Sequence, residues 1–254
     1  MISWSMKILT DIHTHTVASG HAFSTIMENV NVAVERGLEL IAVTDHGICT
    51  TRALDTHYFG GLIQHVPKII NGVTVLRGAE ANVLDEHGKL DVDEKDLKRL
   101  DIVIASCHPP ASPPILSPEL PLAFLPESDA SFLKTYTAVI NNPLVDILGH
   151  ITVCKYLKHL DRVIELAKSK GKLIEINNSH FVNPRCVENV KALIGKCMAQ
   201  QAKVVVSSDA HICTQVGGFD ALCNYLAEIN FPEKLIVNRT KEVLLEFLST
   251  RKRS

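Results

Sequence analysis

Short apolar runs rich in β-branched residues recur along the chain, with longer amphipathic segments between them. Each run is bounded by Gly, Pro, Asp or Asn, as buried parallel strands usually are. The pattern predicts seven strands, at residues 7–12, 40–44, 73–78, 101–105, 145–148, 173–176 and 203–206.

Helical periodicity fills most of the gaps between these runs. Thr25 and Glu28 form a capping box that opens a helix ending at Gly37. Another helix, at residues 160–169, ends before Gly171. Further helices are predicted at residues 131–141, 187–200, 218–229 and 241–249.

The alternation of strand and helix predicts a parallel sheet with crossover helices. A length of 254 residues fits one large domain spanning residues 1–254. No Gly-x-Gly-x-x-Gly or Walker loop follows a strand, so a (β/α) barrel is favoured over an open nucleotide-binding sheet. Residues 109–126 interrupt the pattern with seven prolines and predict a long loop, either a functional lid or a surface excursion.

Composition and charge exclude some classes of protein but do not identify the function. The net charge is −2, and no basic stripe suggests a stable nucleic-acid partner. No apolar stretch reaches membrane-spanning length, and no signal peptide is visible. The seven cysteines lack Cys-x-x-Cys spacing, which favours a reducing, cytoplasmic setting over a disulfide framework. The unusual count is twelve histidines.

Many of these histidines follow predicted strands. In a parallel β/α barrel, chemistry gathers at the carboxyl ends of the strands. Residues i and i+2 of a strand point the same way, so His13 and His15 can hold one ion, as can Asp209 and His211. Imidazole and carboxylate suit Zn, Mn or Fe, and nine candidate ligands suffice for two or three ions. The candidates are His13, His15, His21, His46, Glu80, His108, His150, Asp209 and His211.

These motifs resemble the PHP (polymerase and histidinol phosphatase) family. The matching segments are His13-Thr-His15, Thr44-Asp45-His46-Gly47, Gly78-Ala-Glu80-Ala-Asn82, His108-Pro109 and Ser208-Asp209-Ala-His211. Leu76-Arg-Gly and Glu175-Ile-Asn-Asn-Ser179 are most similar to the YcdX-type phosphatase branch. That branch usually has His-Pro-Gly after its fifth strand, whereas His150 is followed here by Ile151-Thr152.

The resemblance implies a distorted (β/α)₇ barrel, similar to a TIM barrel, with three divalent ions, usually zinc, at the strand ends. By position, His13, His15, Glu80 and Asp209 would hold one ion. The second would bind Glu80, His108 and His150, and the third His21, His46 and His211. The expected enzyme is a phosphatase in which a metal-bound water attacks a small phosphate monoester.

Several neighbouring residues are candidates for supporting roles. Asp45 is a candidate for orienting a ligand histidine, with a turn role equally open, and His180 for supporting catalysis. Lys155, Asn178 and Arg185 are candidates for contacting the substrate.

Three other functions remain open. A phosphodiesterase or nuclease would use the same metal core. An amidohydrolase typically has Lys at the end of the fourth strand, where this chain has Cys107-His108. A non-catalytic metal-binding protein is disfavoured because structural zinc sites are closed and rich in Cys. The physiological substrate, the native metal and a possible homo-oligomer are left undecided.

Overall fold

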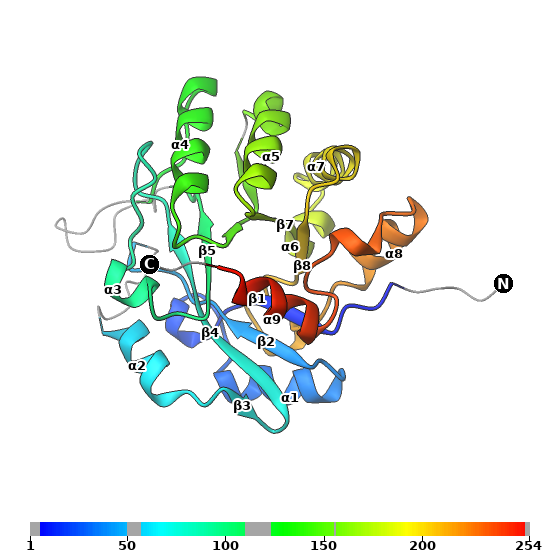
Figure 1. The fold of residues 1–254 in the computed structure, drawn as a ribbon. Helices are drawn as coiled ribbons and strands as arrows, with labels where there is room; N and C mark the ends of the chain where they lie inside the picture. Colours follow the sequence, from blue (N-terminus) through cyan, green and yellow to red (C-terminus); the bar gives the residue numbers. More distant parts are fainter. Residues whose placement is uncertain (1–5, 50–56, 110–122, 155, 252–254) are drawn as a thin grey trace.

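Seven parallel strands form the sheet of the computed structural model, which describes residues 6–49, 57–109, 123–154 and 156–251 (Figure 1). Neighbouring strands pair in the order β1, β2, β4, β5, β6, β7, β8, and the short β3 pairs antiparallel with β4. The bounds are β1 Thr10–Thr14, β2 Leu40–Val43, β3 Ile69–Ile70, β4 Val73–Asn82, β5 Ile102–Ser106, β6 Ile147–Leu148, β7 Leu173–Asn177 and β8 Val204–Ser207.

The sheet returns on itself where β8 meets β1. At the carboxyl ends, Thr14 forms a parallel bridge with Ala210, whose carbonyl accepts a hydrogen bond of 2.8 Å from the His15 amide. Lower down, the Asn238 side chain donates to the carbonyls of Val206 and Thr10, at 2.7 and 3.2 Å. Between β8 and β1, a single bridge and the Asn238 side chain thus take the place of a regular hydrogen-bonded ladder. The predicted distorted seven-stranded barrel is confirmed.

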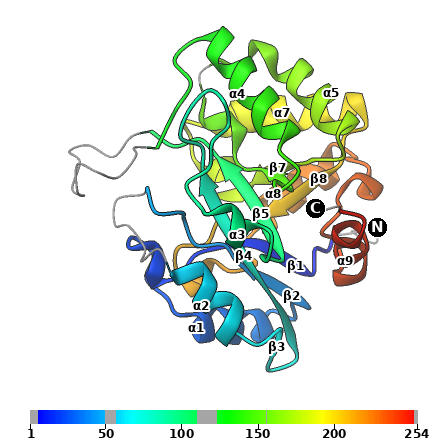
Figure 2. The same ribbon diagram turned by 60° about the vertical axis from the view of Figure 1, so that its left-hand side comes forward.

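Helices surround the barrel, and α4, α5 and α7 line one side of it together (Figures 1 and 2). The bounds are α1 Ile26–Glu35, α2 Tyr58–His65, α3 Glu94–Leu97, α4 Asp129–Asn141, α5 Leu160–Ser169, α6 Asn178–Val182, α7 Val187–Gln200, α8 Asp220–Glu228 and α9 Lys241–Ser249. The predicted capping box is present, with Thr25 accepting from the Glu28 amide and Glu28 accepting from the Thr25 amide. No helix in the described ranges has the length and apolar character needed to cross a bilayer.

Apolar side chains form one layer inside the barrel and another between strands and helices. The inner layer includes Ile12, Ile104 and Val205, and Leu244 and Leu248 of α9 close it from the amino ends of the strands. The outer layer packs the strands against the surrounding helices. Because α9 closes the amino end of the barrel, the polar strand ends are left at the opposite mouth.

Some elements differ from the predicted ones. β4 extends to Asn82 rather than ending at Gly78, so Glu80 lies within the strand. The sequence pattern did not predict β3, α2, α3 or α6, which are all short. Most of the predicted loop at 109–126 lies outside the described residues, which exclude 110–122.

An ion pair at the amino end of β5 should make stability depend on acid pH. Arg77 donates to both carboxylate oxygens of Asp101, at 2.7 and 3.1 Å. Burial raises the pKa of Asp101, but the hydrogen bonds and charge of Arg77 outweigh it, so the pKa lies below the ordinary 3.8. A depressed carboxyl pKa stabilises the fold above the unfolded pKa, and this contribution disappears as pH falls through the folded pKa.

Asp101→Asn is therefore expected to lower the free energy of unfolding at pH 7 by about 1–3 kcal/mol. Urea denaturation should show the difference from wild type narrowing as pH falls below about 4. Asp161→Asn is the control, because Asp161 is 59% exposed and its ion pair with Lys196 contributes little. An Asp101→Asn difference that is constant with pH would contradict this account.

Candidate metal centre

The side chains predicted as metal ligands converge at the carboxyl mouth of the barrel. β1 carries His13 and leads directly to His15, and β4 carries Glu80. The other six follow strand ends or lie in the loop after β1; they are His46, His108, His150, Asp209, His211 and His21.

Glu80 lies at the centre of this group, with its side chain only 1% exposed. Its Oε2 atom lies 3.2 Å from Nε2 of His13 and 3.4 Å from Nε2 of His15. The same oxygen lies 2.9 Å from Nδ1 of His46. One carboxylate oxygen is therefore shared by three imidazoles.

The second oxygen of Glu80 faces the other side of the barrel. Oε1 lies 2.7 Å from Nε2 of His150 and 3.4 Å from Nε2 of His108. Burial alone would raise the pKa of Glu80, but the charges of the surrounding imidazoles, His46 and His13 foremost, hold it well below its usual range. Glu80 is thus a buried carboxylate with imidazole nitrogens close to both of its oxygens.

Three atoms at this centre are buried without a hydrogen-bond partner among the described residues: Nε2 of His13, Nδ1 of His46 and Oε2 of Glu80. Unpaired buried polar atoms are costly, and divalent cations bound at this mouth would satisfy them. Possible ligand atoms form three groups, and within each group these atoms lie within 4.8 Å of one another. The groups are His13, His15 and Asp209; His46, Glu80 and His108; and His15, His46 and His211. The donor set fits a metal centre.

The protonation of this centre also shows a need for positive charge. Burial lowers the pKa of His13, but the charges of Glu175 and Glu80 raise it well above the usual value. The hydrogen bond and charge of Glu80 likewise outweigh burial and raise the pKa of His150 to about 9. Protons on these rings balance the buried carboxylates, and metal ions would displace them.

Asp209 closes the group from β8. Its Oδ1 lies 3.1 Å from Nε2 of His15 and 3.6 Å from Nε2 of His13. Burial raises the pKa of Asp209, but the charge of His13 and the hydrogen bond and charge of His15 lower it far more. Asp209 has φ of 56°, an uncommon left-handed conformation for a residue with a side chain. Such strain is concentrated at functional sites.

His21 and His211 meet at the outer edge of the mouth, where their Nε2 atoms lie 3.0 Å apart. Burial lowers the pKa of both, followed by the charge of His15. Two neutral rings facing each other through nitrogen can share an ion. The ring of His46 lies 4.9 Å from that of His21, but its Nδ1 faces Glu80, so His46 stands between the outer pair and the centre.

Glu175 on β7 also contacts the candidate ligands, although no role was predicted for it from the sequence. Its Oε1 lies 2.6 Å from Nδ1 of His13 and accepts from the Ser207 hydroxyl at 2.6 Å. Its Oε2 accepts from the His150 amide at 2.6 Å. The available signal was an acidic residue inside an apolar strand, since carboxylates are rarely buried without a partner.

Polar residues also orient two other candidate ligands, His15 and His108. Nδ1 of His15 lies 3.0 Å from the Ser19 hydroxyl, which donates to Asp45 at 2.6 Å. Asp45 also accepts from the amide and hydroxyl of Thr16 and from Tyr58. Asp45 therefore acts on the ring of His15 through Ser19, rather than directly on its sequence neighbour His46.

On the other side, Oδ1 of Asn82 lies 2.7 Å from Nδ1 of His108. Asp91 accepts from the amide and side chain of Asn82, at 2.7 and 2.6 Å. A Cβ atom on Gly47 would lie 1.9 Å from Oδ1 of Asp91, so only glycine admits this carboxylate. The arrangement fixes the ring of His108 through two successive polar contacts.

The candidate substrate contacts are scattered. The ring of His180 lies 5.0 Å from that of His150, and burial with the charge of His150 lowers the His180 pKa to about 4. The amide of Asn178 instead donates to the Gly218 carbonyl at 2.8 Å. Arg185 is exposed in the turn before α7, and Lys155 lies outside the described residues.

This chain is similar to known proteins in both sequence and fold. The PHP domain family model matches residues 11–179. A probable phosphatase of Caldanaerobacter subterraneus subsp. tengcongensis is 42% identical over 98% of this chain and 94% of its own. Another, from Clostridium novyi, is 39% identical over 97% and 96%.

A solved structure with the same fold is the histidinol phosphate phosphatase of Lactococcus lactis, complexed with zinc, L-histidinol and phosphate. It has a TM-score of 0.62 and 18% identity, and the match covers 88% of this chain and 93% of that one. The family model covers more than half of the chain, and the relatives named phosphatases match nearly all of it, so the prediction of a phosphatase is confirmed. The chain belongs to the PHP domain family.

Proposed function

We propose that residues 1–254 form one metal-dependent phosphatase domain that hydrolyses small phosphate monoesters at the barrel mouth. One observation carries the proposal: five imidazole nitrogens lie within 3.4 Å of the buried carboxylate of Glu80. Such a constellation is costly without cations and chemically suited to holding them.

The proposed complement is three divalent ions, with zinc favoured and Mn or Fe as alternatives. When bound, such ions supply Lewis acidity toward phosphoryl oxygens and acidify coordinated water. Glu80 would join two ions, and His21 with His211 would complete the third set at the mouth. The grouping of His13, His15 and Asp209 supports the first of these sets, and zinc in the Lactococcus lactis structure supports the choice of metal.

The chain's own residues would fix the geometry of the reaction. Glu175, Ser19 and Asn82 orient three of the ligand rings, so little reorganisation is needed when a phosphate enters. With a pKa of about 4, His180 is neutral at pH 7. It would therefore position the substrate by a hydrogen bond rather than donate a proton as an imidazolium.

Apolar side chains beside the mouth suit the organic part of a monoester. Phe23 is 75% exposed, and its amide donates to the His211 carbonyl at 2.7 Å. Val17 and Ile212 are also exposed on the adjoining segments, at 55% and 38%. A small substrate could rest against this rim while its phosphate reaches the buried centre.

The test is hydrolysis of p-nitrophenyl phosphate beside bis-p-nitrophenyl phosphate, with chelated protein and protein reloaded with zinc or manganese. We expect chelation to abolish monoester cleavage and reloading to restore it. Bound metal is counted in the same samples. Cleavage of the diester alone would instead assign a phosphodiesterase or nuclease, and metal-independent cleavage would refute the proposal.

A further inference from the structure

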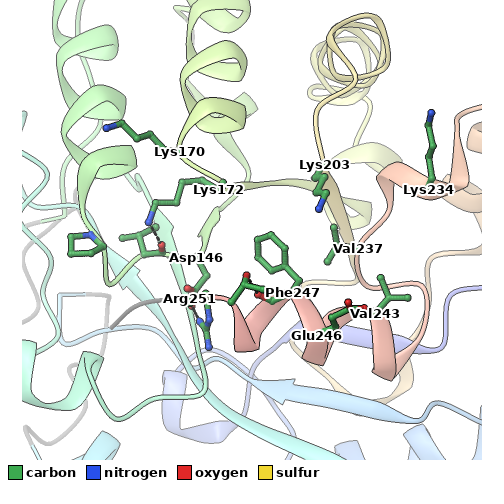
Figure 3. A pocket seen from close by; sticks show the side chains of 14 residues that line it. Asp146, Lys170, Lys172, Lys203, Lys234, Val237, Val243, Glu246, Phe247 and Arg251 are labelled. Carbon is green, nitrogen blue, oxygen red and sulfur yellow. Dashed lines mark hydrogen bonds and ion pairs between the residues drawn. The ribbon is translucent and has the colours of Figure 1, made fainter. Parts of the chain in front are cut away.

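A basic cavity opens at the amino end of the barrel, opposite the metal centre. Its volume is about 640 Å³, within the range of small-molecule sites. The walls come from the segments leading into β6, β7 and β8 and from α9, which crosses this end (Figure 3). The proposed phosphatase site uses none of these residues.

The lining concentrates positive charge. Five cationic side chains face two carboxylates, an excess of three positive charges, whereas the whole chain has a net charge of −2. The cations are Lys170, Lys172, Lys203, Lys234 and Arg251, and the carboxylates are Asp146 and Glu246. A cavity with one dominant sign of charge attracts ligands of the opposite sign.

Three contacts at the inner wall hold the cationic groups of Lys172 and Arg251 in place. Lys172 donates to the carbonyls of Asn142 and Val145, at 2.8 and 2.6 Å. Arg251 pairs with the buried Asp146, which ties the end of α9 to the segment before β6. The wall is thus built before a ligand arrives.

The remaining lysines of the cavity are available to bind an anion. Lys170, Lys203 and Lys234 form no ion pair within the described ranges, and all three are exposed. Lys203 is held over the Phe247 ring, with its Nζ 5.6 Å from the ring centroid. Figure 3 places Lys172 and Lys203 on opposite sides of Phe247, with Lys170 and Lys234 farther out.

Apolar side chains complete the cavity: Val237, Val243 and Phe247 lie between the cations. Lysine ammonium groups bind phosphate effectively as point charges. Three positive charges without a carboxylate partner in the wall exceed the single negative charge of a carboxylate ligand, which favours a phosphate group. We propose that this cavity binds a small molecule that joins an apolar ring to a phosphate group. It is a second ligand site, separated from the metal centre by the inner apolar layer of the barrel.

The test uses two nonhydrolysable dianions, phenylphosphonate and methylphosphonate, which differ in the ring alone. Hydrogen–deuterium exchange of the metal-loaded protein locates binding by segment. We expect phenylphosphonate to slow exchange in residues 241–250 at concentrations at least tenfold below those methylphosphonate requires. Added salt should weaken both effects.

A charge-reversed variant, Lys170→Glu with Lys203→Glu, should raise the apparent Kd at residues 241–250 at least tenfold. Its hydrolysis of p-nitrophenyl phosphate should match wild type, which also shows that it folds. Lys191→Glu is the control, because Lys191 is a half-exposed cation on α7 outside the cavity. Its Kd should be unchanged.

Protection by phenylphosphonate only near the metal centre, or equal protection in wild type and the charge-reversed variant, would overturn the proposal. Equal action of the two phosphonates would overturn the assignment of a ring. Because exchange at residues 241–250 is read directly, the result stands apart from whether the chain proves to be a phosphatase.

Discussion

His13→Ala is expected to lower kcat/KM for p-nitrophenyl phosphate at least a hundredfold. Loss of residues that merely orient metal ligands typically costs about 10–100-fold, so loss of a ligand should cost more. His13 is fully buried, with its Nε2 directed at both Glu80 and Asp209. Its removal should also reduce the number of metal ions bound per chain. Steady-state kinetics and metal counting measure the two effects.

His87→Ala is the matched control, because His87 is exposed in the turn after β4, beside Ala130 and Lys134 of α4 rather than among the candidate ligands. Its activity and metal content should equal those of wild type. Circular dichroism checks that the His13 variant remains folded, and Asp209→Asn provides a second ligand variant of nearly unchanged volume. Activity within a few-fold of wild type in both folded ligand variants would rule out the proposed centre.

Glu175→Gln is expected to weaken zinc binding about 10–100-fold, although Glu175 is not a predicted ligand. The substitution preserves volume and removes the charge that keeps His13 oriented and basic. Competition with a chelator of known affinity measures the zinc Kd. Saturating zinc should restore much of kcat, which distinguishes an orienting residue from a ligand.

Glu165→Gln is the control for a lost carboxylate, since Glu165 is 64% exposed on α5 and pairs with the exposed Arg162 of the same helix. Its zinc affinity should not change. If Glu175→Gln left the zinc Kd unaltered as well, Glu175 would be a structural partner of Ser207 and the His150 amide alone.

Much of the candidate metal centre could be predicted from local sequence. Parallel strands bring their carboxyl ends to one edge, so the pairs His13 with His15 and Asp209 with His211 could be placed at one mouth without coordinates. The helices predicted at residues 160–169, 187–200 and 241–249 match α5, α7 and α9 because periodicity and end signals are local.

The role of Glu175 could not be predicted in this way. A period of two shows that a strand residue faces inward, but not which residue of another strand it meets. The partners of Glu175 are 162 and 32 residues away, in His13 and Ser207. Asp45 shows the same limit, since it acts through Ser19, 26 residues away, rather than on the adjacent His46.

The sequence by itself determined the alternating fold and the set of ligand-type residues, because both depend on periodicity and residue chemistry. Only the tertiary structure decided which carboxylate supports which ring and that His46 faces Glu80. It also gathered Lys170, Lys203 and Lys234 around α9, although no motif joins them. Register and closure of the barrel set these contacts, and both arise from pairing between segments distant in the chain.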